Sequence, residues 1–454
     1  MGISILLSTV VSRLMPNFAE EQYDVIVVGA GFAGLGAASK LEGEGQKVLV
    51  LEATYWIGGR IRAVTLEGGQ TVDGGAMWMD GIDSNNPLHG IINASGTKVR
   101  DFCDWTGGRG YDQVSGTSFD YDWIAEYQGE FDNILDSLRK KLGNKASGKQ
   151  GAELFVQDID GEMQKRIATY SLEDTLMGLE YGAPPDGISL EHIWKEDSFG
   201  EDSVAFPNGY RELTDHMARA LDDIRIKHPV KIIDYSKKGV VTVHVNDTAN
   251  DVIKLISAQR VVVTVSLGVL KVRGIQFIPP LPTEKTDAID RLKMGGTEKV
   301  IFQFETKFWD DVVAIVGSTP LETIGYFFDF SFVYGKNVLV GLVPARTNLE
   351  PEEFISKSLK ELRMVYGEEN VPYPTASWIS DWKGNKFFLG SYSYIPVGAS
   401  PNDMRELGKP IDRTHFAGDG TTPEHFGNTH GALLTGYRAA DEILNSFFPF
   451  ANSN

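Results

Sequence analysis

The 454-residue chain contains a single cysteine, Cys103. One cysteine excludes an intrachain disulfide, a zinc site built from cysteines and a CxxC redox pair, and nothing else in the sequence indicates a metal site. Basic residues are also fewer than acidic ones. The chain has 43 lysines and arginines and 62 aspartates and glutamates, which gives a formal net charge of −19. This imbalance disfavours nucleic acid as a partner and attracts cationic ligands, although the same charge also serves solubility.

A long hydrophobic run is missing at the N-terminus, where the apolar stretch 3–11 is too short to span a bilayer. We therefore expect no membrane span. The stretch also lacks a basic leader and a small-residue cleavage site, so residues 1–22 are interpreted either as an N-terminal extension or as a signal segment. The composition is otherwise that of a globular protein, and the length predicts two domains around a large ligand.

The segment from Tyr23 to Arg60 carries the features of a dinucleotide-binding unit. An entirely apolar run, 25–28, predicts a parallel strand buried on both faces. Gly29 then supplies a tight turn, Gly31 leaves room for a pyrophosphate, and Gly34 allows close packing of helix on strand. The helix that follows offers its N-terminal amides and positive dipole end to an anion.

A second apolar strand, 47–51, ends at Glu52, 18 residues beyond Gly34. A carboxylate at this point accepts both hydroxyls of an adenosine ribose and disfavours a 2'-phosphate. A glycine-rich turn in an ordinary βαβ unit is the alternative, but it does not explain the acid. After Ala53, the paired glycines ending at Gly59 let the backbone pass close to a cofactor, and Arg60 offers a fork of donors to phosphate or carbonyl oxygens.

Four separated segments together resemble the flavin amine oxidase family, in particular its polyamine oxidase branch. They are GAGFAG with Glu52 and GGR, DGGAMWMDG (73–81), VTVSLGVLK with GGTEK, and FAGDGTTPEHFGNTHGALLTG (416–436). The branch includes plant-type polyamine oxidases, and the C-terminal segment is also similar to animal spermine and acetylpolyamine oxidases. The resemblance implies FAD as the cofactor and an α/β fold, in which a discontinuous Rossmann-type FAD-binding domain is joined to an α+β substrate-binding domain.

The expected domains follow from the positions of these segments and of the polar helical stretch between them. The FAD-binding domain is assigned to 23–100, 206–282 and 391–447, and the substrate-binding domain to 101–205 and 283–390. Within the former, residues 260–270 are expected to form a buried strand ending in a glycine turn.

Further cofactor contacts are implied by the resemblance. Family residues that lie along the flavin ring match Gly75, Ala76, Met77 and Trp78. A residue whose backbone touches the adenine matches Val230, Asp419 stands where a Glu usually meets a ribityl hydroxyl, and Asn428 with Thr429 precedes a helix whose N-terminus faces the flavin. No cysteine occurs at 389–398, where monoamine oxidases link the flavin, so we expect non-covalent FAD.

Substrate contacts are implied in the same way. Lys299 matches the lysine that reaches flavin N5 through a water, and Asp80 stands at a substrate-facing position that is Glu in plant-type enzymes and His in animal ones. Glu180 falls where a second acid guards the family's tunnel. Tyr392 matches one aromatic wall beside the substrate amine, together with Trp78, whereas the second aromatic position is Asn428.

Ordinary structural alternatives stay open for these residues. Lys299 is alternatively a solvent-facing lysine at a strand edge, Asp80 a turn residue, and Tyr392 an aromatic residue packed in a sheet.

The implied activity is oxidation of a secondary amine of spermine or spermidine. A hydride passes to flavin N5, the imine is hydrolysed, and O2 reoxidises the flavin to give hydrogen peroxide. An L-amino acid oxidase, another amine oxidase, a histone demethylase and a flavin-binding regulatory protein without turnover are the alternatives. The demethylase is disfavoured because 454 residues leave no room for its additional domains. An amino acid oxidase is disfavoured because no arginine can be assigned to bind the substrate carboxylate. The sequon at Asn93 lies where secreted plant relatives are glycosylated, which favours an extracellular over a cytoplasmic location, and the sequence does not indicate an oligomeric state.

Overall fold

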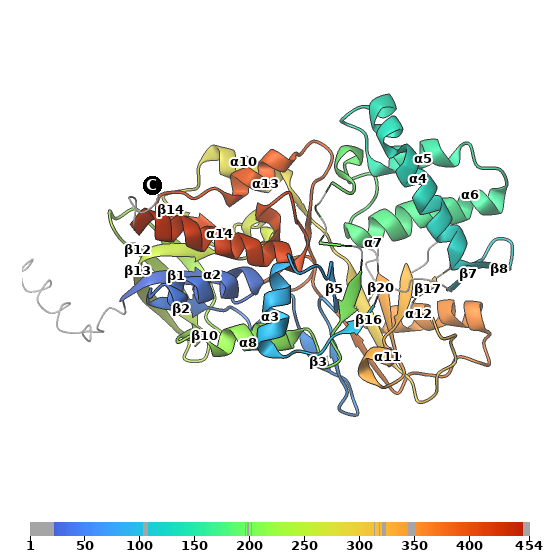
Figure 1. Cartoon of the computed structure of the whole chain (residues 1–454), viewed down its shortest axis with the longest axis horizontal. Helices are drawn as coiled ribbons and strands as arrows, with labels where there is room; N and C mark the ends of the chain where they lie inside the picture. Colours follow the sequence, from blue (N-terminus) through green and yellow to red (C-terminus); the bar gives the residue numbers. More distant parts are fainter. Residues whose placement is uncertain are drawn as a thin grey trace, which may run out of the picture.

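The structure is a computed structural model that describes residues 22–102, 108–195, 197, 199–200, 202–312, 314–316, 318–319, 324–343 and 350–447. Cys103 and all of the N-terminal segment except Gln22 lie outside these residues. The chain forms two halves that lie side by side along the longest axis of the molecule (Figure 1). Among the described residues, no helix is both long and apolar enough to cross a bilayer.

The first half is built on an eight-stranded sheet in which β10, β2, β1 and β13 run parallel. The first part of β13 pairs antiparallel with β12, and its last residues pair in parallel with β23. Its strands are β1 (Gln22–Val28), β2 (Val48–Leu51), β10 (Ile224–Arg225), β11 (Val230–Asp234), β12 (Val241–Asp247), β13 (Val252–Val263), β14 (Gln276–Ile278) and β23 (Thr414–Phe416). The apolar run of β1 is buried, as a central parallel strand requires.

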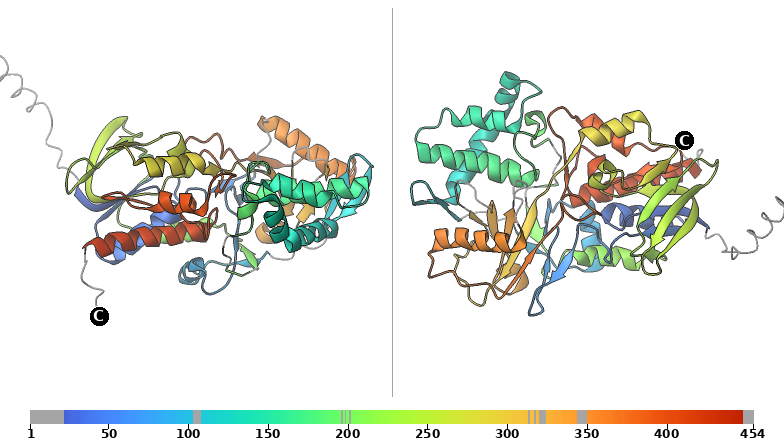
Figure 2. Two further views of the ribbon diagram at one scale, coloured as in Figure 1. Left: turned by 90° about the horizontal axis from the view of Figure 1, so that it is seen from above. Right: turned by 180° about the vertical axis from the view of Figure 1, so that it is seen from behind.

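Two helices far apart in the sequence, α2 (Phe32–Gly43) and α14 (Thr429–Phe447), pack against each other on this sheet (Figures 1 and 2). Their close approach requires glycine at two positions. A Cβ on Gly36 would lie 2.6 Å from Leu433 Cδ1, and a Cβ on Gly436 would lie 2.1 Å from the carbonyl oxygen of Ala33. The C-terminal helix therefore completes the N-terminal dinucleotide unit.

The expected strand at 260–270 is shorter than predicted. Strand β13 ends at Val263, and a short helix, α9 (Leu267–Lys271), replaces the rest. The hydroxyl of Ser266 accepts a hydrogen bond from Val269 N at 3.3 Å and so caps this helix. The local capping signal thus outweighs the apolar pattern.

The second half combines a five-stranded sheet with a helical lobe (Figure 1). The sheet is antiparallel, in the order β17 (Ala314–Val316), β19 (Tyr326–Asp329), β20 (Val338–Val343), β16 (Glu298–Gln303), β21 (Ala376–Ile379). The lobe consists of α4 (Tyr121–Leu142), α5 (Gly148–Val156), α6 (Glu162–Thr169), a π-helix η1 (Tyr170–Met177) and α7 (Gly178–Glu180). Helices α11 (Ser331–Tyr334) and α12 (Pro351–Tyr366) complete this half.

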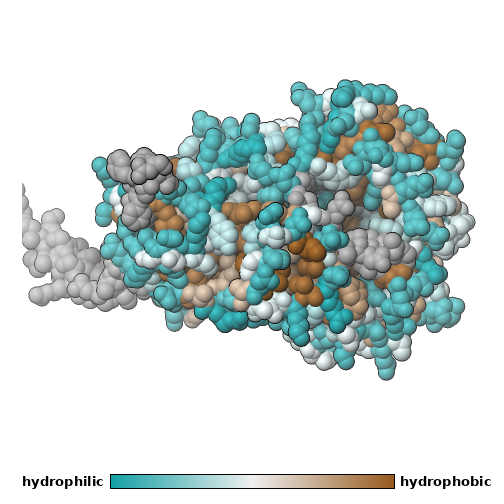
Figure 3. All heavy atoms as spheres, in the orientation of Figure 1, coloured by the Kyte–Doolittle hydropathy of each residue, from teal (hydrophilic) through white to brown (hydrophobic). Residues whose placement is uncertain are grey.

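Smaller elements connect the halves or cover their edges. The strands are β3 (Ala63–Thr65), β4 (Thr71–Asp73), β5 (Trp78–Asp80), β6 (Arg100–Asp101), β7 (Arg109–Asp112), β8 (Thr117–Asp120), β9 (Ser203–Ala205), β15 (Lys293–Met294), β18 (Ser318–Thr319) and β22 (Ser393–Tyr394). The helices are α3 (Pro87–Ser95), α8 (Arg211–Arg219), α10 (Thr283–Arg291), α13 (Pro401–Gly408) and the short 3-10 turns η2 (Leu190–His192) and η3 (Asp419–Thr421). In the orientation of Figure 1, the surface is largely hydrophilic, and hydrophobic residues gather near the middle of the face (Figure 3).

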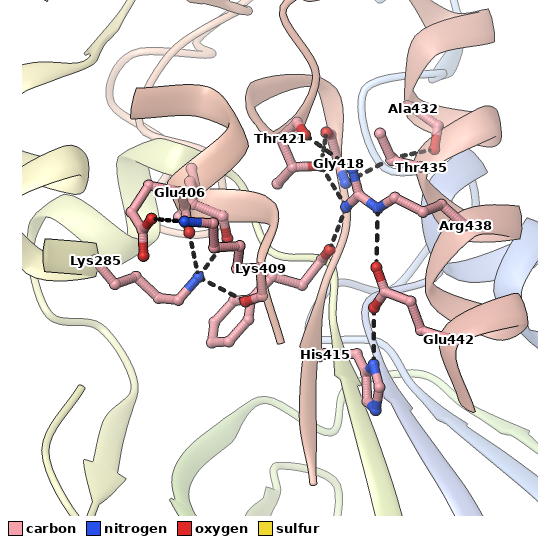
Figure 4. Close-up of polar contacts among 12 residues, drawn as sticks. Lys285, Glu406, Lys409, His415, Gly418, Thr421, Ala432, Thr435, Arg438 and Glu442 are labelled. Atoms are coloured by element: carbon pink, nitrogen blue, oxygen red, sulfur yellow. Dashed lines mark hydrogen bonds and ion pairs between the residues drawn. The ribbon is translucent and has the colours of Figure 1, made fainter. Parts of the chain in front are cut away.

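Helix α10 shows where the chain passes from the first half to the second. It packs on α13 and α9, both of which belong to the first half, so within 283–390 the chain reaches the five-stranded sheet only after this helix. A buried lysine, Lys285, connects α10 to the end of α13. Its Nζ donates to the carbonyl oxygens of Glu406 and Leu407 at 2.7 Å and of Lys409 at 2.8 Å, at the end of α13 (Figure 4).

A second polar cluster in Figure 4 holds the turn after β23 against α14. Arg438 of α14 donates to the carbonyl oxygens of Phe416 and Thr421, and the hydroxyl of Thr435 accepts from Gly418 N at 2.9 Å. These bonds fix the backbone on both sides of Asp419, one of the predicted cofactor contacts. The helix that completes the dinucleotide unit therefore also positions this loop.

We predict that Lys285→Met destabilises the protein. The substitution leaves three carbonyl oxygens at a helix end without their donor, at a cost of about 2–3 kcal/mol in the free energy of unfolding. Thermal denaturation of the flavin-loaded protein measures this change. The matched control is Lys409→Met, which removes an exposed ion pair with Glu406 and is expected to cost less than about 1 kcal/mol. Equal effects of the two substitutions would contradict the assignment.

Candidate functional site

A cavity of about 730 Å³ extends from the glycine turn after β1 to the five-stranded sheet and the helical lobe. Both halves of the molecule line it. Of the predicted site residues, all line the cavity except Gly34. Gly34 instead packs within the turn, because a Cβ there would lie 1.9 Å from the carbonyl oxygen of Gly29. The structure therefore brings segments separated by up to 400 residues to one site.

The dinucleotide end is formed by the first βαβ unit. Gly29 has a φ of +110°, which favours glycine, and α2 starts at Phe32 with no side chain capping its first amides. Glu52 is buried, and its two carboxylate oxygens accept from Ala30 N and Thr54 N at 2.8 Å each. These bonds fix the carboxylate at the cavity wall, and Ala53 and Val230 line the same region.

Gly31 provides a test of whether this end fits FAD. A Cβ on Gly31 would meet no protein atom closer than 3.9 Å, so packing within the protein does not require glycine there. The free space opens on the cavity, beside the uncapped amides of α2. A pyrophosphate needs such space and such donors, and a ribose needs an acid such as Glu52. The residues therefore fit the adenosine diphosphate part of FAD.

Arg60 and Asp419 form an ion pair in the cavity wall. The guanidinium of Arg60 donates to both carboxylate oxygens of Asp419 and to the carbonyl oxygen of Ser391 at 2.6 Å. Asp419 also accepts from Ser393 N and Ser393 Oγ at 2.9 Å. Burial would raise the pKa of this carboxyl, but Arg60 and the Ser393 hydrogen bonds outweigh burial and hold the pKa below its usual value. Asp419 is thus a fixed anion where the resemblance expects a ribityl contact.

The segment from Gly75 to Trp78 forms one wall of the next part of the cavity. It lies so close to the Arg60 segment that a Cβ on Gly75 would stand 1.8 Å from the Arg60 carbonyl oxygen. Asn428, Thr429 and the start of α14 line the cavity as well. A flat ring system fits between such backbone walls, and the N-terminus of α14 supplies a positive dipole end for it.

Lys299 lies on the cavity floor in β16, with β20 and β21 on either side. It is therefore not at a strand edge, and the alternative of a solvent-facing edge lysine is wrong. Its Nζ donates to the carbonyl oxygen of Gly75 and lies 5.4 Å from the ring centroid of Trp78. Burial lowers the pKa of Lys299 to about 7, although a nearby carboxylate, Asp73, opposes this shift.

Asp73 was missed by the sequence analysis, although it opens the quoted motif DGGAMWMDG. Its carboxylate is completely buried and accepts from Tyr210 N at 3.1 Å and from the hydroxyl of Tyr334 at 3.3 Å. Burial raises the pKa of Asp73 to about 7, against these hydrogen bonds and the charge of Lys299. A buried acid and a buried amine whose pKa values are both shifted toward neutral by burial are typical of a functional site. No signal in the sequence pairs them, because they lie 226 positions apart.

Asp80 ends strand β5 and reaches the cavity two residues after Trp78. Its carboxylate accepts from Ser203 Oγ at 2.7 Å and also from the side chain of Trp78. The Asp80 side chain is exposed to the cavity, and the partial desolvation of its carboxylate raises its pKa despite the two hydrogen bonds. An ammonium ion in the cavity would find in Asp80 a carboxylate that Ser203 holds in position.

Glu180 and Tyr392 lie near each other at another part of the wall. The hydroxyl of Tyr392 donates to the carbonyl oxygen of Leu179 and lies 2.8 Å from Thr297 Oγ1. Burial and the charge of Glu180 raise the pKa of Tyr392 well above its usual value, so the hydroxyl stays protonated. Tyr392 is thus held rigidly at the cavity and not within a sheet core.

Four polar residues at the end of the cavity away from Glu52 were also missed. They are Tyr121 and Gln128 of α4, Thr175 of the π-helix η1, and Tyr326 of β19. Each stands in a segment whose pattern indicates only a helix or a strand. No motif distinguishes them, because their meeting depends on how the helical lobe sits on the five-stranded sheet.

Comparisons with known proteins agree with this geometry. Residues 32–444 match the family model described as flavin containing amine oxidoreductase. The solved structures that resemble the chain include a putrescine oxidase double mutant (TM-score 0.77, 21% identity, 93% of this chain and 99% of that chain) and the cyclohexylamine oxidase of Brevibacterium oxydans (TM-score 0.76, 21% identity, 94% and 99%). At these identities the likeness concerns the fold, and it confirms the flavin amine oxidase architecture.

Curated relatives fall into two groups. Polyamine oxidase 4 of Oryza sativa subsp. japonica is 30% identical over 92% of this chain and 88% of its own length. Lysine-specific histone demethylase 1 homolog 3 of Arabidopsis thaliana is also 30% identical, over 94% of this chain, but this chain spans only 30% of its length. The peroxisomal N(1)-acetyl-spermine/spermidine oxidase of Bos taurus is 29% identical over 94% of this chain and 96% of its length. The chain thus belongs to the flavin-containing amine oxidoreductases and is an FAD-dependent amine oxidase.

Proposed function

We propose that this enzyme oxidises a secondary amine of a polyamine such as spermine or spermidine. The observation that carries the proposal is the cavity itself, in which two carboxylates, Asp80 and Glu180, line the space that also contains Lys299 and continues to the dinucleotide end. A polyamine is a flexible chain of methylenes with several positive charges. Separated carboxylates joined by apolar walls match that pattern better than they match a monoamine or an amino acid.

The aromatic wall between these groups suits the methylene segments. Trp78 lies 5.6 Å from Phe328, and Phe328 lies 5.8 Å from Tyr326, as measured between ring centroids. Such rings exclude water and attract neighbouring cations through their faces. Asp80, which accepts from the Trp78 side chain, anchors one ammonium group at the start of this wall.

Bound FAD would accept a hydride from the carbon beside the amine and pass the electrons to O2. The chain aligns the amine and excludes competing water. Lys299 Nζ holds a proton at the same wall as Gly75, where it organises a water molecule and assists proton movement during reoxidation. The cavity lining contains no cysteine among the described residues, and we propose that FAD is held non-covalently.

Anaerobic addition of amines to the flavin-loaded protein tests this proposal. We expect polyamines to bleach the flavin absorbance faster than a monoamine, an L-amino acid or a peptide containing methylated lysine. The peptide is included because demethylase homologues match the chain at 30–31% identity. Faster bleaching by the peptide or by the amino acid would overturn the proposal, and absence of bleaching by every amine would point to a binding protein without turnover.

Asp80→Asn is expected to weaken polyamine binding. The substitution keeps the shape and removes the charge that holds an ammonium group, so we expect kcat/KM to fall by about 10- to 100-fold, mainly through KM. Steady-state oxygen consumption measures both constants. Asp83→Asn, at an exposed acid three residues away, is the matched control and should leave KM within about twofold. An unchanged KM in Asp80→Asn would contradict the role.

Asp73→Asn is expected to change the pH dependence of flavin reoxidation. The charge of Asp73 raises the pKa of Lys299, so its removal lets the pKa fall below about 7, and the protonated amine is lost at a lower pH. Stopped-flow mixing of the reduced protein with oxygen at different pH values should show the alkaline loss of rate displaced toward lower pH.

The control for this experiment is Tyr334→Phe, which removes a neutral neighbour of Asp73 and should displace the profile less. An unchanged profile in Asp73→Asn, or equal displacement in both variants, would argue against the coupling of Asp73 with Lys299.

A further inference from the structure

One irregular segment forms much of the cavity wall. Residues 380–391, which we call the wall loop, connect β21 to β22, and all of them are described and lie outside helices and strands. Six of them line the cavity, namely Trp382, Lys386, Phe387, Phe388, Leu389 and Ser391. A loop lacks the hydrogen-bond ladder of a strand, so other groups must hold this wall in place.

Glu298, at the start of β16, binds the first part of the wall loop. Its carboxylate accepts hydrogen bonds from the backbone amides of Trp382 at 3.0 Å and Lys383 at 2.8 Å. It also accepts from the hydroxyl of Ser380. Hydrogen bonds to an ionised acceptor are stronger than those between neutral groups. One half-buried carboxylate therefore gathers three donors from the beginning of the loop.

Ser380 extends this contact to Lys299. Its hydroxyl accepts from Lys299 N at 2.7 Å while it donates to Glu298, and its amide donates to the carbonyl oxygen of Lys299 at 2.9 Å. The regular pairing of β16 with β21 ends just before this point, at Val300 and Ile379. The Ser380 hydroxyl thus continues the connection where the strand ladder stops, and it fixes the backbone from which the Lys299 amine projects.

The other end of the wall loop is bound by the residue before Glu298. Thr297 N donates to Ser391 Oγ at 3.1 Å, and the carbonyl oxygen of Ser391 accepts from Arg60 at 2.6 Å. Both ends of the loop are therefore attached to the short stretch 297–299, which also carries the buried amine.

Trp382 is the aromatic residue that Glu298 holds most directly. It is buried, lines the cavity and packs edge-on against Phe388, with 5.3 Å between the ring centroids. Successive side chains of a strand point to opposite faces, and Glu298, unlike Lys299, is not among the described residues that line the cavity. Glu298 thus holds two cavity residues from outside the cavity.

The effect of Glu298 on Lys299 is one of position. Burial and the opposing charge of Asp73 account for the pKa of Lys299. The Glu298 carboxylate is instead occupied by its three donors in the wall loop. A change at this residue should therefore alter where the amine and the tryptophan ring lie and leave the pKa of the amine in place.

We propose that Glu298 is a positioning residue for flavin reoxidation, which acts through Ser380 on Lys299 and through the backbone amide on Trp382. The proposal rests on the role in reoxidation proposed above for Lys299. Formation of hydrogen peroxide from O2 takes two electrons and one proton from the reduced cofactor and one further proton. The placement of the Lys299 ammonium group decides how readily that further proton is delivered.

Stopped-flow mixing of the photoreduced holoenzyme with O2 tests the proposal without any amine substrate. Glu298→Gln turns an amide nitrogen toward the donors of the wall loop, so we expect the reoxidation rate constant per bound flavin to fall by about tenfold. The pH profile of the rate should keep its position. The matched control is Glu305→Gln, at an exposed acid just beyond β16, which should leave the rate within about twofold.

Amide hydrogen exchange gives a second measurement that does not depend on turnover. In Glu298→Gln we expect exchange over residues 380–391 to be faster by about tenfold, in the flavin-free protein as well as in the holoenzyme. Exchange in Glu305→Gln should match the wild type.

Substitutions of Ser380 separate positioning from a general loss of stability. Ser380→Ala removes the hydroxyl and should slow reoxidation by about fivefold, whereas Ser380→Thr keeps it and should stay within about twofold of the wild type. Because Ser380 and Glu298 act in one chain of hydrogen bonds, Ser380→Ala should add little to Glu298→Gln. The thermal midpoint is measured separately for each variant.

Unchanged reoxidation or unchanged exchange in Glu298→Gln would overturn the proposal, and so would a displaced pH profile or equal effects of Ser380→Ala and Ser380→Thr. Lys299→Met distinguishes this failure from failure of the proposed function. If Lys299→Met slows reoxidation and Glu298→Gln does not, the positioning role alone is wrong. If Lys299→Met leaves reoxidation unchanged, the role proposed for Lys299 is wrong and the role of Glu298 falls with it.

Discussion

The buried amine of Lys299 is the constraint on which the site depends. It comes from the five-stranded sheet of the second half, yet it donates to the carbonyl oxygen of Gly75. The Gly75 segment packs closely against the backbone of Arg60 in the dinucleotide unit. A buried amine requires a partner, because burial without one costs several kcal/mol. The carbonyl oxygen of Gly75 and the charge of Asp73 provide it, so the same interaction that joins the two halves also brings a titratable group to the cavity.

The two ends of the cavity are built by different means. Glycines and helix N-termini form the cofactor end, where backbone amides and open space matter more than side chains. Carboxylates, aromatic rings and hydroxyl groups form the substrate end, where the position of each side chain decides which ligand fits. The Arg60 and Asp419 ion pair lies between them. Helix α14, which also packs on the dinucleotide unit, is hydrogen-bonded to the backbone on both sides of Asp419.

The cofactor end of the molecule was predictable from the sequence. The apolar run of β1, the spacing of Gly29, Gly31 and Gly34, and Glu52 are local signals, and each lies where the pattern indicates. The strand expected at 260–270 was not fully predictable, because the cap at Ser266 starts a helix inside an apolar stretch. Asp73 and the four polar residues Tyr121, Gln128, Thr175 and Tyr326 could not be predicted, because they meet their partners only when segments far apart in the sequence come together in the folded chain.

The most direct test of this account is a crystal structure of the FAD-loaded protein with a slowly reacting polyamine. The account predicts that the adenosine part lies at Glu52, that the reactive edge of the flavin faces Lys299, and that the polyamine extends from there between Asp80 and Tyr326. A flavin ring bound away from Lys299, or a polyamine bound outside the cavity, would contradict it.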